Sequence, residues 1–209
     1  MTKIEGKRAA ILLLGAPGAG KGTQGAVLGS IPRFLHYASG DVFRALDTRT
    51  PLGRKFVEYS SRGELVPDEV TVELWAQHMD NMVKSHSYKP DIDILVLDGT
   101  PRTLRQCEML EDYVEMLQIF HLSCPNREEL ARRLRKRALK EQRLDDASEE
   151  VIQRRIQTYE DETKPILDYY PDEIQTDINA DETPAQVTFN ILAKVLELPA
   201  YQKIASVVA

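Results

Sequence analysis

A glycine-rich stretch near the start of the sequence holds the residue types best suited to chemistry. Residues 15–24 read GAPGAGKGTQ. Gly15, Gly20 and Lys21 have the spacing of a phosphate-binding loop, but the expected hydroxyl comes one place late, on Thr23. In such a loop, successive backbone N–H groups form a concave anion site and the lysine adds a full positive charge. The stretch therefore predicts a site for the phosphates of a nucleotide.

The segments around this loop have the order that a phosphate-binding loop requires. An apolar run at 9–14 predicts a buried strand before it, and helical spacing over 20–30 predicts a helix after it, which argues against an accidental glycine turn. Further strands are expected at 33–38, 93–98, 119–124 and 173–178, and further helices at 69–87, 103–117, 127–142, 149–168 and 184–196. This alternation predicts a parallel sheet with helices on both faces, with ligands beyond the carboxyl ends of the strands.

Asp98 ends the apolar run 93–98 and is the strongest candidate for a role at a metal ion. A hydrophobic strand that ends in Asp beside a phosphate loop is the Walker-B arrangement. Because Mg²⁺ keeps several waters and takes few protein ligands, we expect Asp98 to act in its outer shell, through water. The alternative is an ordinary turn residue in the pair Asp98–Gly99.

Basic residues cluster in the second half of a chain whose net charge is −6. Between residues 127 and 143, eight Lys and Arg side chains stand against three Glu. Such a helix is usually a solvated face and sometimes binds nucleic acid, but this one follows a strand on the phosphate edge. Phosphoryl transfer depends mostly on positioning and electrostatic clamping, for which planar arginine is suited. The histidines are isolated along the sequence and are expected to be structural or exposed: His36, His78, His86 and His121.

Composition limits the class of protein further. A chain of 209 residues is long enough for one substantial core with small inserted lobes. Cys107 and Cys124 form no CxxC pair, so neither a structural zinc site nor a disulfide framework is expected. The apolar run at 9–14 is too short to span a bilayer, and we expect a cytoplasmic protein.

Five segments, taken together and in order, resemble the adenylate kinase and nucleoside monophosphate kinase family. They are GAPGAGKGTQ (15–24), SGDVFR (39–44), GELVPDEVTVEL (63–74), LDGTPRTLRQ (97–106) and RLDDASEEVIQRRIQTYEDETKPILDYY (143–170). The late position of Thr23 is a trait of that family. The resemblance covers about residues 9–196 and implies a P-loop NTPase fold, a three-layer α/β/α core with a five-stranded parallel sheet. That core would comprise 1–37, 69–137 and 150–209, with a small helical NMP-binding lobe at 38–68 and a short lid at 138–149.

The resemblance also implies roles for individual residues. ATP would be bound by Gly18, Ala19, Gly20, Lys21, Gly22, Thr23 and Arg133. AMP would be bound by Ser39, Arg44, Val66, Gly99, Arg102, Gln106, Arg143 and Arg155. The transferring phosphoryl group would be surrounded by Lys21, Arg102, Arg137, Arg143 and Arg155, with Arg154 as the alternative to Arg155.

The resemblance implies the reaction ATP + AMP ⇌ 2 ADP with Mg²⁺ and without structural zinc. Gln106 stands where adenylate kinases have the Gln that reads adenine and UMP/CMP kinases have Asn, and its amide both donates and accepts. A UMP/CMP kinase is the nearest alternative, because residues 155–170 read somewhat like that branch, and a nucleotide sensor without transfer activity is a second. The expected partners are ATP, AMP and ADP, for a monomer that binds neither nucleic acid nor membrane. One departure is Thr100, where the family has an aromatic residue before a cis proline.

Overall fold

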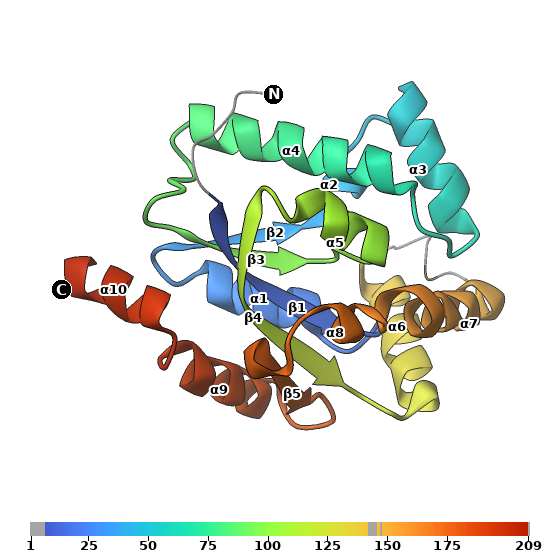
Figure 1. The fold of residues 1–209 in the computed structure, drawn as a ribbon. Helices are drawn as coiled ribbons and strands as arrows, with labels where there is room; N and C mark the ends of the chain where they lie inside the picture. Colours follow the sequence, from blue (N-terminus) through green and yellow to red (C-terminus); the bar gives the residue numbers. More distant parts are fainter. Residues whose placement is uncertain (1–6, 142–145, 147, 209) are drawn as a thin grey trace.

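A parallel sheet forms the centre of the computed structural model, which describes residues 7–141, 146 and 148–208. Its strands are β1 (Arg8–Gly15), β2 (Phe34–Ala38), β3 (Ile94–Asp98), β4 (Val114–Ser123) and β5 (Gln175–Asn179). They lie in the order β2-β3-β1-β4-β5, and every neighbouring pair is parallel (Figure 1). The predicted five-stranded parallel sheet is confirmed.

Helices cover both faces of the sheet because its central strand is apolar on both sides. Ile11 and Leu13 face one helical layer, and Leu12 and Leu14 face the other. The first layer contains α1 (Lys21–Gly29), α6 (Arg127–Glu141), α7 (Glu149–Thr158), α9 (Pro184–Val195) and α10 (Pro199–Val208). The second contains α4 (Asp68–Lys84), α5 (Leu104–Leu110) and α8 (Ile166–Tyr169). The result is the predicted three-layer α/β/α arrangement.

Two predicted helices are too long. The helix expected at 103–117 ends at Leu110, and the chain is already in β4 from Val114, where pairing with Arg8 of β1 overrides the local helical spacing. The helix expected at 149–168 breaks into α7, a π-helical turn η2 (Tyr159–Thr163) and α8. Pro165 lacks the N–H needed to continue the helix. Helix α10 was not predicted.

Residues 38–68 form a small helical segment between β2 and α4. They contain α2 (Ser39–Arg44) and α3 (Pro51–Ser61), which lie beside the first half of α4 (Figure 1). Phe43 stacks on Phe56 with ring centroids 5.3 Å apart. Together with Val66 they belong to a small apolar cluster that is separate from the two main core clusters. A short 3₁₀ turn, η3 (Asp172–Ile174), leads into β5. Among the described helices, none combines the length and the apolar composition needed to cross a membrane.

Candidate active site

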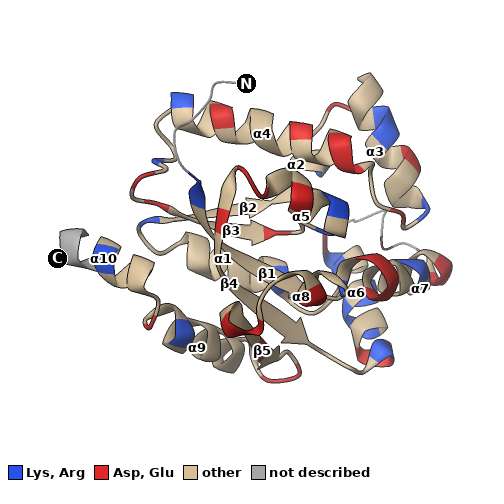
Figure 2. Ribbon diagram, viewed as in Figure 1, with Lys and Arg blue, Asp and Glu red and all other residues tan. Residues whose placement is uncertain are grey.

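A cavity of about 910 Å³ lies at the carboxyl ends of the central strands. Its walls include Gly15 at the end of β1, Ala38 at the end of β2 and Asp98 at the end of β3. Helices α2, α3, α6 and α7 also contribute residues to its lining. Figure 2 shows basic residues gathered on α6, beside this cavity. The cavity therefore combines the edge where α/β sheets bind ligands with a positively charged wall.

The phosphate loop occupies the floor of the cavity in the conformation that its glycines allow. Gly18 and Gly20 have φ values of 88° and 98°, in the left-handed region that favours glycine. Lys21 folds back over the loop, and its Nζ donates to the carbonyl oxygens of Gly15 (2.7 Å) and Ala16 (3.1 Å). Burial lowers the pKa of Lys21 to about 8, against the opposing effect of Asp98. The lysine is thus held at the loop before any phosphate binds.

Asp98 lies next to the loop and is surrounded by positive groups. Burial by itself raises the pKa of its carboxyl, but His36, Lys21 and Arg102 outweigh burial and hold that pKa below its usual value. The His36 Nε2 lies 3.8 Å from Asp98 Oδ2, beyond hydrogen-bond distance. His36 is isolated only along the sequence, since β2 brings it beside the end of β3. Asp98 is available as a carboxylate at the edge of the cavity.

His121 is not isolated either. Its Nδ1 lies 2.6 Å from Asp177 Oδ1 on β5, and its Nε2 lies 2.9 Å from the hydroxyl of Tyr159 at the start of η2. The sequence could not show this contact, because the three residues belong to separate elements that meet only when the sheet forms. Tyr159 lines the cavity, so the contacts from Asp177 through His121 to Tyr159 help to hold one wall of the cavity in place.

Two arginines converge on one buried carboxylate. Arg137 Nε donates to Asp146 Oδ2 (2.9 Å), and Arg155 Nη1 donates to Oδ1 of the same side chain, whose exposed fraction is 0%. Positive charges on Arg102, Arg137 and Arg155 contribute to the lowered pKa of Lys21, which places all three around one point. Sequence reasoning assigned no role to Asp146. A carboxylate that holds two arginines leaves the remaining guanidinium donors fixed in direction.

Arg155, rather than its neighbour, lies at the cavity. Arg154 does not line the cavity; its side chain is 57% exposed and its Nη1 lies 3.4 Å from Glu64 Oε1. Arg143 lies outside the described residues. Every other residue predicted to bind a nucleotide or the metal lines the cavity: Gly18, Ala19, Gly20, Lys21, Gly22, Thr23, Ser39, Arg44, Val66, Asp98, Gly99, Arg102, Gln106, Arg133, Arg137 and Arg155. Their individual roles stay predictions.

The turn after β3 brings Arg102 close to α2. Arg102 Nε donates to the Gly99 carbonyl (2.8 Å), which also accepts from Ser39 Oγ (2.6 Å). A Cβ on Gly99 would lie 2.6 Å from Arg102 Nη2, so a larger residue would displace the guanidinium. The peptide bond between Thr100 and Pro101 is cis, although Thr100 replaces the aromatic residue of the family.

Gln106 lies in the wall near Arg102, and its amide is engaged at both ends. Its Oε1 accepts from the backbone N–H of Arg102 (2.7 Å), and its Nε2 donates to Asp68 Oδ1 (2.8 Å). Asp68, the first residue of α4, is 38 positions away in the chain. Sequence reasoning missed Asp68, since no local spacing connects it with Gln106.

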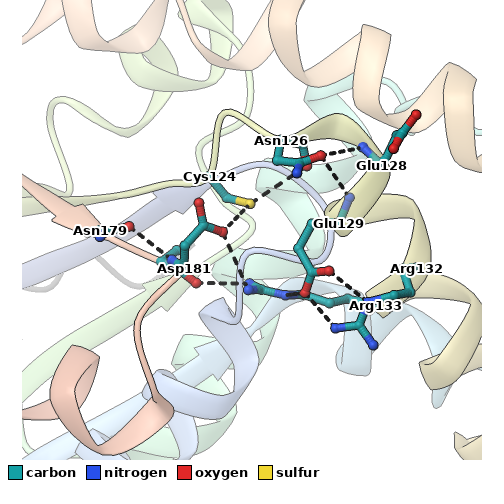
Figure 3. Close-up of polar contacts among 9 residues, drawn as sticks. Cys124, Asn126, Glu128, Glu129, Arg132, Arg133, Asn179 and Asp181 are labelled. Atoms are coloured by element: carbon teal, nitrogen blue, oxygen red, sulfur yellow. Dashed lines mark hydrogen bonds and ion pairs between the residues drawn. The ribbon is translucent and has the colours of Figure 1, made fainter.

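Arg133 also lines the cavity, and its guanidinium has polar contacts with residues of two segments (Figure 3). Its Nε donates to Glu129 Oε1 (2.7 Å) and its Nη1 to the Ala180 carbonyl (2.9 Å), while Nη2 lies 3.5 Å from Asp181 Oδ1. Cys124 Sγ donates to that Asp181 oxygen (3.0 Å). The contact between Arg133 and Glu129 could have been predicted from the sequence, because Glu129 lies four positions earlier on the predicted helix. The contact with Asp181 could not, because Asp181 comes from the loop after β5.

Comparison with known proteins places these features in one family. A family model described as adenylate kinase matches residues 13–175. The adenylate kinase of Cyanothece sp. (strain PCC 7425 / ATCC 29141) is 40% identical over 169 residues, which cover 78% of this chain and 82% of the relative. That of Corynebacterium diphtheriae is 39% identical over 168 residues, covering 79% and 88%. Adenylate kinase 1 of Nostoc sp. (strain PCC 7120) is 34% identical over 190 residues, covering 88% and 96%. The chain belongs to the adenylate kinase family.

Membership of the adenylate kinase family makes the chain a phosphotransferase and confirms the resemblance seen in its motifs. It also favours adenylate kinase over the UMP/CMP kinase alternative. A Cβ on Gly22 would lie 3.6 Å from Asp98 Oδ2, an ordinary contact, so steric crowding by Asp98 does not explain the glycine.

Proposed function

We propose that this phosphotransferase catalyses the reversible reaction ATP + AMP ⇌ 2 ADP. The observation that carries the proposal is that a single cavity is lined by two groups of residues suited to binding phosphate. One is the phosphate loop with Lys21. The other is formed by Arg44 and Arg102, beside a buried amide, Gln106, that is suited to reading a base. A sensor that binds one nucleotide has no need for the second group.

The donor and acceptor are assigned to opposite parts of the cavity. ATP lies with its phosphates on residues 18–23 and its adenine against Arg133. AMP lies among Ser39, Val66, Gly99 and Gln106, with its phosphate on Arg44 and Arg102. We propose that 38–68 is the NMP-binding lobe and 138–149 the short lid, although 142–145 and 147 fall outside the described part of the chain. The remaining segments form the core.

Catalysis in this account is positioning and charge neutralisation. The attacking phosphate oxygen of AMP needs no general base, so the protein must align the two nucleotides in line and offset charge on the transferring group. Lys21, Arg102, Arg137 and Arg155 supply that charge, joined by Arg143. Closure of the lobe and lid over both nucleotides excludes water, which prevents hydrolysis of ATP.

Magnesium fits this site only with help from the substrate. The described residues contain no group of three His, Cys, Asp or Glu side chains that could hold a metal ion. Asp98 is held as a carboxylate beside Lys21 and would contact the ion through water, with the other ligands supplied by ATP oxygens and water. When bound, the ion neutralises charge between the terminal phosphates of ATP.

A coupled phosphotransfer assay tests the proposal. The protein is given Mg·ATP with AMP, CMP, UMP or GMP, and a control without acceptor measures hydrolysis. We expect strong turnover with AMP and almost none without acceptor. Preference for CMP or UMP would reject the assignment of the base, and binding of ATP without transfer to any acceptor would reject the enzyme.

We also propose a monomeric protein of the cytoplasm. Cys107 and Cys124 are both buried and unbridged, as expected for thiols kept reduced. Light scattering at assay concentration tests the monomer, and a dimer mass would contradict it.

A further inference from the structure

The side-chain amide of Gln106 has an orientation that its two protein partners determine. The backbone N–H of Arg102 is a donor only, so the amide atom that it meets at 2.7 Å must be the oxygen. The Asp68 carboxylate is an acceptor only, so the atom that it meets at 2.8 Å must be the nitrogen. Reversing the amide would oppose donor to donor at one end and acceptor to acceptor at the other.

Burial makes this arrangement costly to break. Gln106 is 1% exposed, and an unsatisfied polar atom at such a position is destabilising because it has lost water without gaining a partner. Asp68 Oδ1 also accepts from Thr103 Oγ1 (3.0 Å), and that hydroxyl in turn accepts from the Gln106 backbone N–H (3.1 Å). The N-terminal turn of α5 is therefore fastened to the first residue of α4, and the amide cannot turn without disturbing both.

One hydrogen of the Gln106 amide stays available to a ligand. The nitrogen carries two N–H groups, and among the described residues only Asp68 accepts from it. Gln106 also lines the cavity. An acceptor base thus meets a single fixed N–H donor. The amide oxygen accepts from Arg102 and keeps a second lone pair, so the expectation that the amide both donates to the base and accepts from it stays a prediction.

We propose that Asp68 is a positioning residue that sets the acceptor specificity of this enzyme, by holding Gln106 so that it offers one N–H to the ring nitrogen of the base. The proposal rests on the proposed function, in which AMP occupies this part of the cavity. It selects bases whose Watson–Crick ring nitrogen is an acceptor, as N1 of adenine is. It rejects bases that carry a hydrogen there, as hypoxanthine and guanine do at N1 and uracil does at N3.

Acceptor analogues test this selection without changing the protein. Purine riboside 5′-monophosphate keeps N1 and lacks the 6-amino group, 1-deaza-AMP keeps the amino group and lacks N1, and IMP carries a hydrogen on N1. With Mg·ATP as donor, we expect kcat/KM to fall about 10- to 100-fold for 1-deaza-AMP and IMP, because each leaves the buried N–H without an acceptor. Purine riboside monophosphate should fall less than either. Equal kcat/KM for AMP and 1-deaza-AMP would overturn the proposal.

A matched pair of variants assigns the effect to Asp68. Asp68→Ala removes the acceptor that holds the amide, whereas Glu69→Gln removes a charge from the same first turn of α4 at an exposed position. We expect Asp68→Ala to raise KM for AMP more than it lowers kcat and to reduce the preference for AMP over 1-deaza-AMP several-fold. Asp68→Asn, which keeps an acceptor oxygen, should recover most of that preference. Glu69→Gln should match the unaltered protein.

The outcomes separate a positioning role from a purely structural one. If Asp68 only fastened α4 to α5, Asp68→Ala would lower melting temperature and kcat alike and leave the ratio of the two acceptors unchanged, and that result would overturn the proposal. Failure of the proposed function would be different: the unaltered protein would transfer no phosphoryl group to AMP at all. If Asp68→Ala does not fold, the analogue series on the unaltered protein still decides whether one N–H reads the ring nitrogen.

Discussion

The residues that we propose contact the two bases are held by different means: Gln106 at the proposed acceptor end of the cavity and Arg133 at the proposed donor end. At the acceptor end, Gln106 is 1% exposed and is held by a backbone N–H and by Asp68. At the donor end, Arg133 is 28% exposed and is held by Glu129 and Asp181, whose side chains are 24% and 40% exposed. The first arrangement is buried and directional. The second is a planar guanidinium group that carboxylates hold near the surface.

This difference has a consequence for specificity. A buried site built to hydrogen-bond one ring atom discriminates strongly, because the wrong base leaves a desolvated group unpaired. A guanidinium plane attracts the face of any aromatic base and reads none of its edges. We therefore expect the acceptor base to be selected strictly and the donor base leniently. The following changes would break or sharpen that contrast.

Arg102→Ala should give the largest effect, since it removes a charged group at the point between donor and acceptor. We expect kcat/KM to fall on the order of 10²-fold or more, as for loss of an electrostatic clamp. Steady-state kinetics with AMP measure it. Arg105→Ala is the matched control, because that arginine lies three positions further along the chain, is 59% exposed and pairs with Glu108. Near-normal turnover in Arg102→Ala would show that the assignment is wrong.

Asp146→Asn should weaken the hold on two arginines of the cavity, Arg137 and Arg155, and so affect both stability and catalysis. Removing one partner of a buried ion pair costs about 3–5 kcal/mol of unfolding free energy. Denaturant unfolding should show that loss, and kcat should fall about tenfold as the two guanidinium groups lose their alignment. Glu149→Gln is the control, since its pair with Arg135 is exposed and should contribute little to stability. Unchanged stability in Asp146→Asn would contradict the buried pairing.

Alkaline pH should weaken the donor site through Lys21. Its pKa of about 8 means that the free enzyme loses this positive charge as pH rises through 8 and keeps it below. The value of kcat/KM for ATP should therefore decline about tenfold per pH unit above that point, whereas kcat should hold to higher pH because bound phosphates favour the charged form.

The control for this pH effect is Lys21→Arg, which cannot lose its charge and should lack the alkaline decline at whatever activity it keeps. An alkaline limb of kcat/KM that is unchanged in Lys21→Arg would assign the titration to another group.

Glu129→Gln should give the smallest effect. The Glu129–Arg133 pair is partly exposed, so solvent and salt screen it and its contribution is small. We expect KM for ATP to rise two- to fivefold or less, with KM for AMP unchanged. Glu128→Gln, one position earlier on α6, is the control. A larger effect on AMP than on ATP would contradict the placement of the donor at this end.

Sequence reasoning reached the features that depend on local order and missed those that depend on contacts across the fold. The phosphate loop, the alternation of strands and helices and the run of arginines each lie in one continuous segment, and from them the sheet and the family were predictable. Asp68, Asp146 and Asp181 were not assigned roles. Each holds a site residue on a different element, so its function exists only after the sheet brings the two together.

The helix expected at 103–117 failed for a related reason. Its second half has helical spacing, and only the pairing of Val114 with Arg8 of β1 turns it into a strand. The same cause hid the neighbours of His36 and His121, which sit on strands and meet their partners across the sheet. Local pattern predicts which residues are present at an edge but not which side chains hold one another there.

A matrix of phosphotransfer rates tests the central claim most directly. Each of Mg·ATP, Mg·GTP, Mg·CTP and Mg·UTP is paired with each of AMP, CMP, UMP and GMP, and kcat/KM is measured for every pair. We predict that changing the donor base alters kcat/KM by less than about tenfold, whereas replacing AMP by GMP or UMP lowers it by about 10²-fold or more. Steeper selection of the donor than of the acceptor, or no transfer to AMP, would contradict the account.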